Sequence, residues 1–225
     1  MDAQPQTGFV LWLTGMQGAG KTSLARFLHQ RLALAGRRAE IIDADEPGEV
    51  LTGGLGPGKD DRDASVRRVG FVAKMLARNG VVVICASLSP YREAREALRR
   101  EARRFVEVFV DCPMETLQQR SSIYRKAIAG EVRNVAGVDD PYEPPTHAEV
   151  VIHSEQEAVE AAAMRIFQAL VDLKYVGPTE FGRLTGGRRP KRARPPRKAA
   201  GRKPTRKASA KAAARAPGKA RSARR

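Results

Sequence analysis

The sequence predicts an α/β fold in which a parallel sheet carries helices on both faces. Short, almost wholly apolar runs alternate along the chain with longer stretches of helical periodicity. Runs that are apolar at every position are typical of parallel strands covered on both sides, and strands alternating with helices indicate βαβ units. A glycine-rich turn joins the first such run to the first helical stretch, which narrows the class further.

That turn follows the predicted strand 9–13 and precedes a helical pattern that begins near Thr22. Strand, glycine-rich turn and helix, in that order, form the context of the phosphate-binding P-loop. Glycines let backbone N–H groups curve around an oxyanion, and the helix N-terminus adds partial positive charge. The order predicts a P-loop NTPase three-layer sandwich that binds a nucleoside triphosphate, with Lys21 on the outer phosphates and Thr22 ligating Mg²⁺. The predicted nucleotide-binding residues are Gly15, Met16, Gln17, Gly18, Ala19, Gly20, Lys21, Thr22 and Ser23.

The later elements are predicted in the same way. The helix 22–35 ends at Gly36, and a second strand, 39–42, delivers Asp43 and Asp45 at its carboxyl end. We expect further strands at 81–86, 105–110 and 150–152, helices at 60–77, 92–104 and 155–173, and a short helix after Pro113. Residues 46–59 are rich in glycine and proline and predict a mobile loop, and 120–147 predict a lid. The strand ends should converge on one crevice.

The C-terminal part differs from the rest in composition. The formal net charge is +16, and residues 183–225 contain 18 Lys or Arg and no Asp or Glu, so 16 − 18 leaves −2 for residues 1–182. We expect a folded domain over 1–176 and a disordered basic tail over 177–225, because the tail has too little apolar surface to bury. Its charge predicts nonspecific contact with nucleic acid, and a solvated extension without a partner is the alternative.

Other features exclude several classes of protein. Cys85 and Cys112 lie in apolar surroundings without metal-ligand spacing, which favours a reduced cytoplasmic protein. The three histidines are scattered, so a histidine metal site is not expected. No apolar run reaches membrane-spanning length, and residues 1–8 lack signal-peptide features.

Ordered motifs over 10–151 resemble the adenylylsulfate (APS) kinase family. Besides the P-loop they are Leu11-Trp12-Leu13-Thr14, Asp61-Arg62, Val66-Arg67-Arg68-Val69-Gly70, Ser89-Pro90-Tyr91-Arg92, Phe105-Val106-Glu107-Val108-Phe109-Val110, Tyr124-Arg125-Lys126-Ala127, Ala129-Gly130-Glu131 and Gly137-Val138-Asp139-Asp140-Pro141-Tyr142-Glu143-Pro144-Pro145. The resemblance implies phosphoryl transfer from ATP to the ribose 3′-hydroxyl of APS in sulfate activation. It also implies a homodimer.

The resemblance also assigns roles to particular residues. Asp45 matches the family's base or hydroxyl-orienting carboxylate, and Arg62 matches an arginine that contacts APS. Ser89 matches the serine described as a phosphoserine intermediate, although no activating base adjoins it in the sequence, which favours a substrate contact or a turn. The further expected contacts are Asp43, Ser65, Arg92, Arg95 and Lys126 with the acceptor or phosphates, and Arg120 with ATP.

The departures from the family pattern lie where APS should bind. Pro57 and Val135 replace the two aromatic residues that pack on the acceptor adenine, and Ser65 replaces an asparagine. Glu46 and Glu49 add negative charge in the segment that follows Asp45. A stacked ring contributes about 1–3 kcal/mol. Two alternatives therefore stay open: a kinase of this family with another hydroxyl acceptor, and a nucleotide-binding regulatory module that attaches to nucleic acid through its tail.

Overall fold

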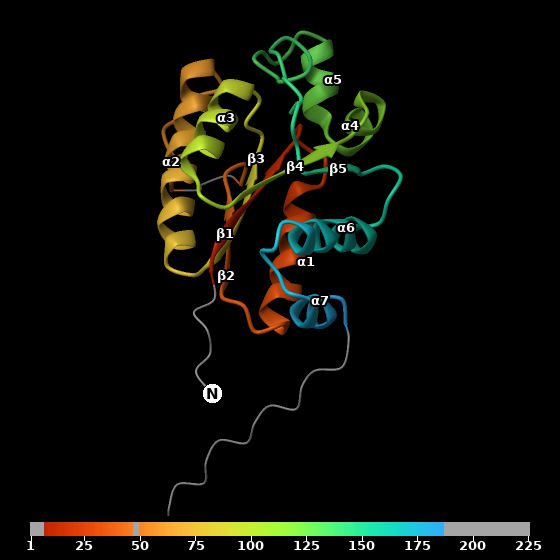
Figure 1. Cartoon of the computed structure of the whole chain (residues 1–225). Helices are drawn as coiled ribbons and strands as arrows, with labels where there is room; N and C mark the ends of the chain where they lie inside the picture. Colours follow the sequence, from red (N-terminus) through yellow and green to blue (C-terminus); the bar gives the residue numbers. More distant parts are fainter. Residues whose placement is uncertain (1–6, 47–49, 187–225) are drawn as a thin grey trace, which may run out of the picture. The chain divides into compact units, whose positions relative to one another are not determined.

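The sheet is fully parallel, as the sequence predicts. The computed structural model describes residues 7–46 and 50–186 (Figure 1). Within them, five strands form one sheet in the order β2-β3-β1-β4-β5, and all neighbouring pairs are parallel. The strands are β1 (Phe9–Thr14), β2 (Ala39–Asp43), β3 (Val82–Ser87), β4 (Phe105–Asp111) and β5 (Val150–His153).

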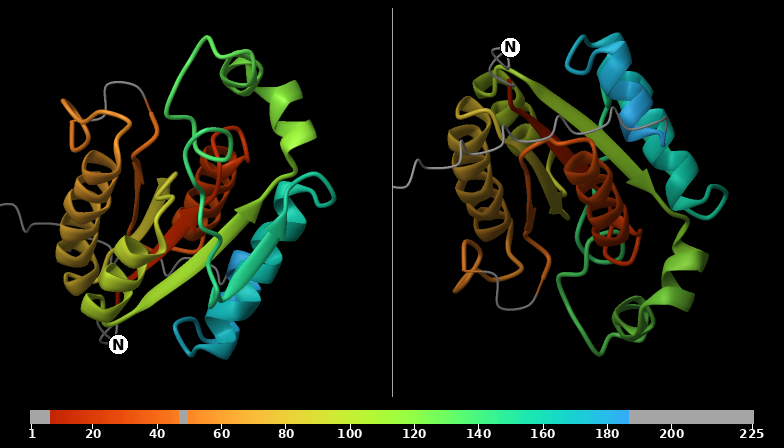
Figure 2. Two further views of the ribbon diagram at one scale, coloured as in Figure 1. Left: turned by 90° about the horizontal axis from the view of Figure 1, so that it is seen from above. Right: turned by 90° about the horizontal axis from the view of Figure 1, so that it is seen from below.

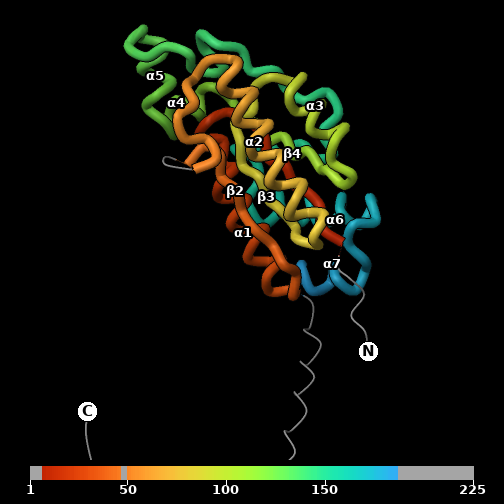
Figure 3. The backbone as a smooth tube through the Cα atoms, turned by 90° about the vertical axis from the view of Figure 1, so that its left-hand side faces the viewer, coloured from red at the N-terminus to blue at the C-terminus, as the bar shows by residue number. Residues whose placement is uncertain are grey.

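Helices cover both faces of this sheet and confirm the three-layer sandwich (Figure 2). One face carries α1 (Lys21–Leu34), α6 (Val159–Asp172) and α7 (Pro178–Leu184), and the other carries α2 (Lys59–Arg78) and α3 (Arg92–Glu101). Figure 3, viewed from the side of α2, shows this helix lying over the sheet beside β3. The helices α4 (Met114–Arg120) and α5 (Ser122–Ile128) lie beyond the carboxyl end of the sheet (Figure 1).

The central strand β1 lies between two helical layers, and this position explains why its residues are apolar. Phe9, Leu11 and Leu13 join the core cluster beneath α1 and α6, whereas Val10 and Trp12 join the cluster beneath α2 and α3. Successive side chains of a strand point to opposite faces, so a strand between two helical layers needs apolar residues at every position. All six residues of β1 are buried.

Three of the sequence predictions need correction. The helix α3 ends at Glu101 and not at residue 104, because Ala102 adopts an extended backbone (φ −91°, ψ 119°). The helix α6 begins at Val159 and not at residue 155, because Ala158 adopts an extended backbone (φ −68°, ψ 153°). The predicted boundary at residue 177 lies too early, because α7 follows it and Leu184 is fully buried in the core.

The salt bridge between Arg37 and Glu180, at 2.5 Å, also fastens α7 to the folded unit. The remaining predictions for the basic tail concern 187–225 and lie outside the described residues, as do residues 47–49 of the predicted mobile loop. Over the described ranges 7–46 and 50–186, no helix is long and apolar enough to span a membrane.

Candidate active site

The turn after β1 has the backbone that an anion cradle requires. Gly15, Gly18 and Gly20 have φ values of 153°, 82° and 103°, which non-glycine residues rarely adopt. A Cβ atom on Gly15 would lie 2.3 Å from the carbonyl oxygen of Val110, so the close approach to β4 also demands glycine. The helix α1 begins directly afterwards, at Lys21. The loop therefore presents its backbone and the positive end of α1 at the carboxyl end of the central strand.

The ammonium group of Lys21 lies where the P-loop meets the end of β2. Its Nζ donates to the carbonyl oxygens of Gly15, at 2.7 Å, and Met16, at 3.0 Å. It also lies 2.9 Å from Oδ2 of Asp45, and the Lys21 side chain is only 4% exposed. The buried Lys21 ammonium group thus lies between the P-loop carbonyls and Asp45, the carboxylate to which the family resemblance assigns a role.

Asp43 and Asp45 lie at the carboxyl end of β2, next to the start of α1. The hydroxyl of Thr22 donates to Oδ2 of Asp43 at 2.6 Å, and the backbone N–H of Asp45 donates to Oδ1 of Asp43 at 3.2 Å. The backbone N–H of Leu88, just after β3, donates to Oδ1 of Asp45 at 2.8 Å. The predicted convergence of three strand ends is therefore present, and both carboxylates are held by specific donors.

Two cavities, the first of them lined by Asp45, share Pro57, Arg62 and Leu88 in their walls. The first has a volume of about 240 Å³ and includes Asp45 and Ser65. The second has a volume of about 300 Å³, and its remaining lining includes Gln17, Tyr124, Val135 and Ala136. The two cavities adjoin at these shared residues, and we call them together the groove, whose lining extends from Asp45 to the loop that follows α5.

Arg62 is the cation common to both cavities. Its Nε donates to the Pro57 carbonyl at 2.6 Å, and its Nη2 donates to the Asn134 carbonyl at 2.5 Å. Nη1 lies 3.3 Å from Oδ2 of Asp140, yet this buried atom has no partner in hydrogen-bond geometry. The guanidinium is thus held by the loop before α2 and by the loop between α5 and β5, and its buried Nη1 lacks a partner in hydrogen-bond geometry.

Asp140 and Tyr91 complete the support of Arg62, and the sequence assigned neither a role. The hydroxyl of Tyr91 donates to Oδ1 of Asp140 at 2.9 Å, and Lys59 Nζ lies 4.8 Å from the centroid of the Tyr91 ring. Burial, followed by the nearby Asp140 carboxylate, raises the pKa of Tyr91. The neutral phenol is therefore the form that donates to Asp140.

Ser89 lies in a buried hydrogen-bond network beneath the first cavity. The indole N–H of Trp12 donates to its Oγ at 3.0 Å, and this Oγ is 3.0 Å from the hydroxyl of Thr14, which in turn contacts the Tyr142 hydroxyl at 3.0 Å. Ser89 is 3% exposed and has a φ of +34°. No carboxylate, imidazole or amine lies within hydrogen-bond distance of this hydroxyl among the contacts of the described residues.

Other expected contact residues are placed differently. Arg95 is almost fully buried and binds Glu107 and the carbonyls of Ser89 and Glu143, so it faces inward and not toward an anion. Arg92 donates to the carbonyl of Pro144 and lines neither groove cavity. Lys126 is exposed on α5, also outside the groove lining.

Two residues at the P-loop connect it to the helices beyond the sheet. Arg120 donates to the Gly18 carbonyl at 3.5 Å and to the Ser154 carbonyl at 3.1 Å, so it lies at the nucleotide loop, and its contact with ATP stays a prediction. The hydroxyl of Tyr124, which sequence reasoning missed, donates to the Gln17 carbonyl at 2.8 Å. Burial raises the pKa of Tyr124, which keeps this donor protonated.

A P-loop at the switch point of a parallel sheet, with an acceptor groove beside it, defines a P-loop kinase. A family model described as adenylylsulphate kinase matches residues 7–153, and the chain belongs to this family. An adenylyl-sulfate kinase of Rippkaea orientalis is 44% identical over 173 residues, covering 76% of this chain and 96% of the relative. One from a Picosynechococcus species is 43% identical, covering 76% and 98%.

Solved structures agree with this family membership. The Mycobacterium tuberculosis APS kinase CysC in complex with AMPPNP and APS is 32% identical, with a TM-score of 0.69, covering 74% of this chain and 99% of that one. A shikimate kinase from Acinetobacter baumannii, 24% identical with a TM-score of 0.50, shares the fold. The chain is accordingly an ATP-dependent transferase of the adenylylsulphate kinase family.

Proposed function

We propose that this protein transfers the γ-phosphoryl group of ATP to the 3′-hydroxyl of APS and forms PAPS and ADP. The observation that carries the proposal is the contact between Lys21 and Asp45, at 2.9 Å. It brings the Lys21 ammonium group of the nucleotide loop into contact with the Asp45 carboxylate of the acceptor groove. A phosphoryl donor and a hydroxyl acceptor meet there, which is the arrangement that this transfer requires.

On the donor side, the loop 15–20 and the start of α1 would hold the phosphates. Lys21 would exchange the carbonyls of Gly15 and Met16 for phosphate oxygens, because phosphate is the stronger acceptor. Thr22 and Asp43 offer a hydroxyl and a carboxylate whose oxygens are 2.6 Å apart, a hard-donor pair that suits Mg²⁺. We propose that Thr22 ligates this ion directly and Asp43 holds it through water. Bound Mg²⁺ would neutralise charge on the phosphates.

On the acceptor side, Asp45 would orient the hydroxyl and receive its proton. The hydroxyl oxygen bonds to the γ-phosphorus, the bond to the β–γ bridging oxygen breaks, and ADP leaves. Asp45 can do this because Leu88 N–H fixes one of its oxygens while the other faces Lys21. Loss of a positioned proton acceptor slows turnover about 10²–10⁴-fold, so Asp45→Asn should show a loss of kcat within that range.

Arg62 would bind the anionic group of the acceptor. Its side chain is 11% exposed and lines both cavities, and its Nη1, which is ion-paired with Asp140 at 3.3 Å without hydrogen-bond geometry, would gain a hydrogen bond to an incoming oxyanion. This feature, in the shared wall of the two cavities, matches a small anionic substrate better than a neutral one.

A second candidate function is phosphorylation of a different hydroxyl compound by the same site. The observation that favours it is the lining of the second cavity, which includes both Pro57 and Val135. These are the positions where the family resemblance leads us to expect adenine-packing rings. Without them the groove offers aliphatic surface and less stacking energy to a purine.

The two functions are separated by measuring ADP release with ATP and Mg²⁺ against APS and a panel of other hydroxyl acceptors. PAPS formation at micromolar APS supports the first proposal. ATP binding without APS-dependent turnover overturns it and favours the second. The variant Val135→Phe should lower the KM for APS if a purine lies in this cavity, whereas Val138→Phe, on the exposed part of the same loop, is the matched control.

We also propose that the protein works in the cytoplasm and that it forms a homodimer. A related APS kinase from Thiobacillus denitrificans is described as hexameric, and this chain spans 30% of the length of that relative. Sedimentation of the purified full chain measures the oligomeric state directly.

A further inference from the structure

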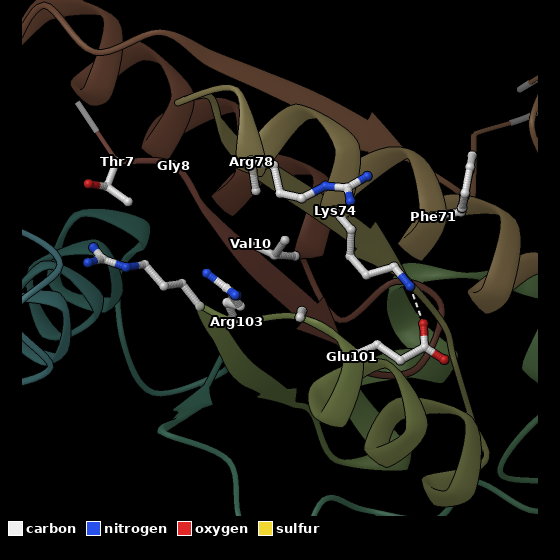
Figure 4. Close-up of a pocket in the computed structure, with 11 residues that line it drawn as sticks. Thr7, Gly8, Val10, Phe71, Lys74, Arg78, Glu101 and Arg103 are labelled. Carbon is white, nitrogen blue, oxygen red and sulfur yellow. Dashed lines mark hydrogen bonds and ion pairs between the residues drawn. The ribbon is translucent and has the colours of Figure 1, made fainter. Parts of the chain in front are cut away.

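A larger cavity lies at the opposite end of the sheet from the P-loop. Its volume is about 590 Å³, and its walls come from the start of β1, the C-terminal half of α2 and the turn between α3 and β4 (Figure 4). Gly8 and Val10 line it, whereas the P-loop starts at Gly15. Five strand residues at about 3.3 Å each separate Val10 from Gly15 by roughly 16 Å. The cavity is therefore distinct from the kinase site.

Positive charge dominates this cavity. Its lining includes Lys74, Arg78, Arg103 and Arg104 against one carboxylate, Glu101. Lys74 pairs with Glu101, as the dashed line in Figure 4 marks, and Arg104 lies over the Tyr175 ring at 5.2 Å.

The side chains of two of these arginines are available to bind a ligand. Within the described part of the chain, Arg78 and Arg103 are exposed and have no hydrogen bond or ion pair from their side chains. Figure 4 shows Arg78 on α2, next to Lys74, and Arg103 on the turn before β4. Guanidinium groups offer planar, two-pronged donors that match phosphate oxygens.

The rest of the wall is apolar and includes an exposed ring. Val10, Ala77 and Ala102 line the cavity, and Phe71 stands at its edge with 59% of its surface exposed. An exposed ring of this kind can stack on a planar group of a ligand. The volume falls within the range of small-molecule sites and far exceeds that of an inorganic phosphate.

We propose that this cavity is a second binding site for an organic anion of nucleoside-phosphate type. Its phosphate groups bind Arg78 and Arg103, and its planar base packs on Phe71. Charge complementarity selects the anionic end, and the apolar wall with its ring selects the aromatic end. The site is independent of the phosphoryl transfer proposed above.

The test uses ADP as the probe and the full-length chain. The Lys21→Ala background weakens the P-loop site, and Phe71→Trp in that background supplies a fluorophore in the cavity wall, since Trp12 is fully buried. We expect ADP to change the new tryptophan signal saturably. Arg78→Ala with Arg103→Ala should weaken this binding at least 10-fold, because two charge-assisted contacts are lost.

A matched control removes two exposed arginines elsewhere, Arg26→Ala with Arg100→Ala, and keeps the same net charge change. It accounts for the general effect of removing two positive charges, and it should leave the fluorescence titration unchanged. The milder pair Arg78→Gln with Arg103→Gln repeats the measurement if the alanine pair fails to fold.

Three results would overturn the proposal: no saturable fluorescence change, equal weakening by the control pair, or dissociation of an oligomer by the Arg78 and Arg103 variants in sedimentation experiments. The last result would mean that the surface is an interface between copies of this chain.

Discussion

Replacing Ser89 by alanine separates a covalent role of this serine from a structural one. In the structure its Oγ accepts the indole N–H of Trp12 at 3.0 Å and contacts the Thr14 hydroxyl at 3.0 Å. Trp12 and Ser89 are both buried, so Ser89→Ala leaves the indole N–H without an acceptor. We therefore expect the variant to be less stable and still active.

The magnitude follows from the number of donors left unpaired. One buried unsatisfied donor costs about 1–3 kcal/mol. In a domain of 150–250 residues each kcal/mol lowers Tm by about 2–4 °C, so the melting temperature should fall by roughly 2–12 °C. Turnover should stay within a few-fold of the parent, because no general base in the described structure contacts this hydroxyl.

Calorimetry measures Tm, and ADP release with saturating ATP and APS measures turnover. Ser122→Ala, at an exposed serine of α5, serves as the control and should change neither quantity. Loss of nearly all turnover without a change in Tm would refute the reasoning. So would recovery of radiolabelled phosphate on Ser89 after incubation with labelled ATP.

Three further variants test other parts of the site. Arg62→Ala should raise the KM for APS at least 10-fold with little change in the KM for ATP, because one charge-assisted contact is lost; equal effects on both constants, in initial-rate kinetics, would argue against an acceptor role. Tyr124→Phe removes the hydrogen bond to the Gln17 carbonyl and should weaken ATP binding by a few-fold in calorimetric titrations, while unchanged affinity would separate α5 from nucleotide binding. For Asp139, the backbone N–H groups of Val135 and Asn134 hold the pKa of the carboxyl below its usual range. Its stabilising effect is therefore present above the unfolded pKa and is lost as pH falls through the folded one. Asp139→Asn should flatten the stability curve below about pH 4, where an unperturbed aspartate titrates, and an unchanged acid limb in denaturant titrations would contradict this.

The sequence predicts those parts of the fold that are encoded by a pattern of neighbouring residues. The strand β1 is apolar along almost its whole length, and the P-loop carries its glycines and Lys21 within eight residues. The helix α7 was missed because its seven residues contain only two large apolar side chains, Phe181 and Leu184. Burial of Leu184 depends on α1, far away in the sequence, and no local pattern reports that contact.

The candidate site shows the same division. The contact between Lys21 and Asp45 could be predicted, because both residues follow parallel strands whose carboxyl ends lie at the same edge of the sheet. The support of Arg62 by Asp140 joins residues 78 positions apart, through a loop whose path no periodicity predicts. The expected contact of Arg95 with the acceptor was wrong, because Glu107 on β4 offers its guanidinium a buried partner at 2.8 Å that the local sequence of the helix does not reveal.

The bonds of α7 to α1 and to the turn that follows α1 have a consequence for how this protein folds. Arg31 donates to the carbonyl of Leu184 across 153 positions, and Arg37 pairs with Glu180 across 143. Contacts of such long sequence separation form late, because the entropy of closing the intervening chain must be offset first. The helix that carries Lys21 at its first turn is thus among the first elements synthesised, and its far end is completed only when residue 184 has been made. Until then, part of the surface of α1 remains open to solvent and to aggregation.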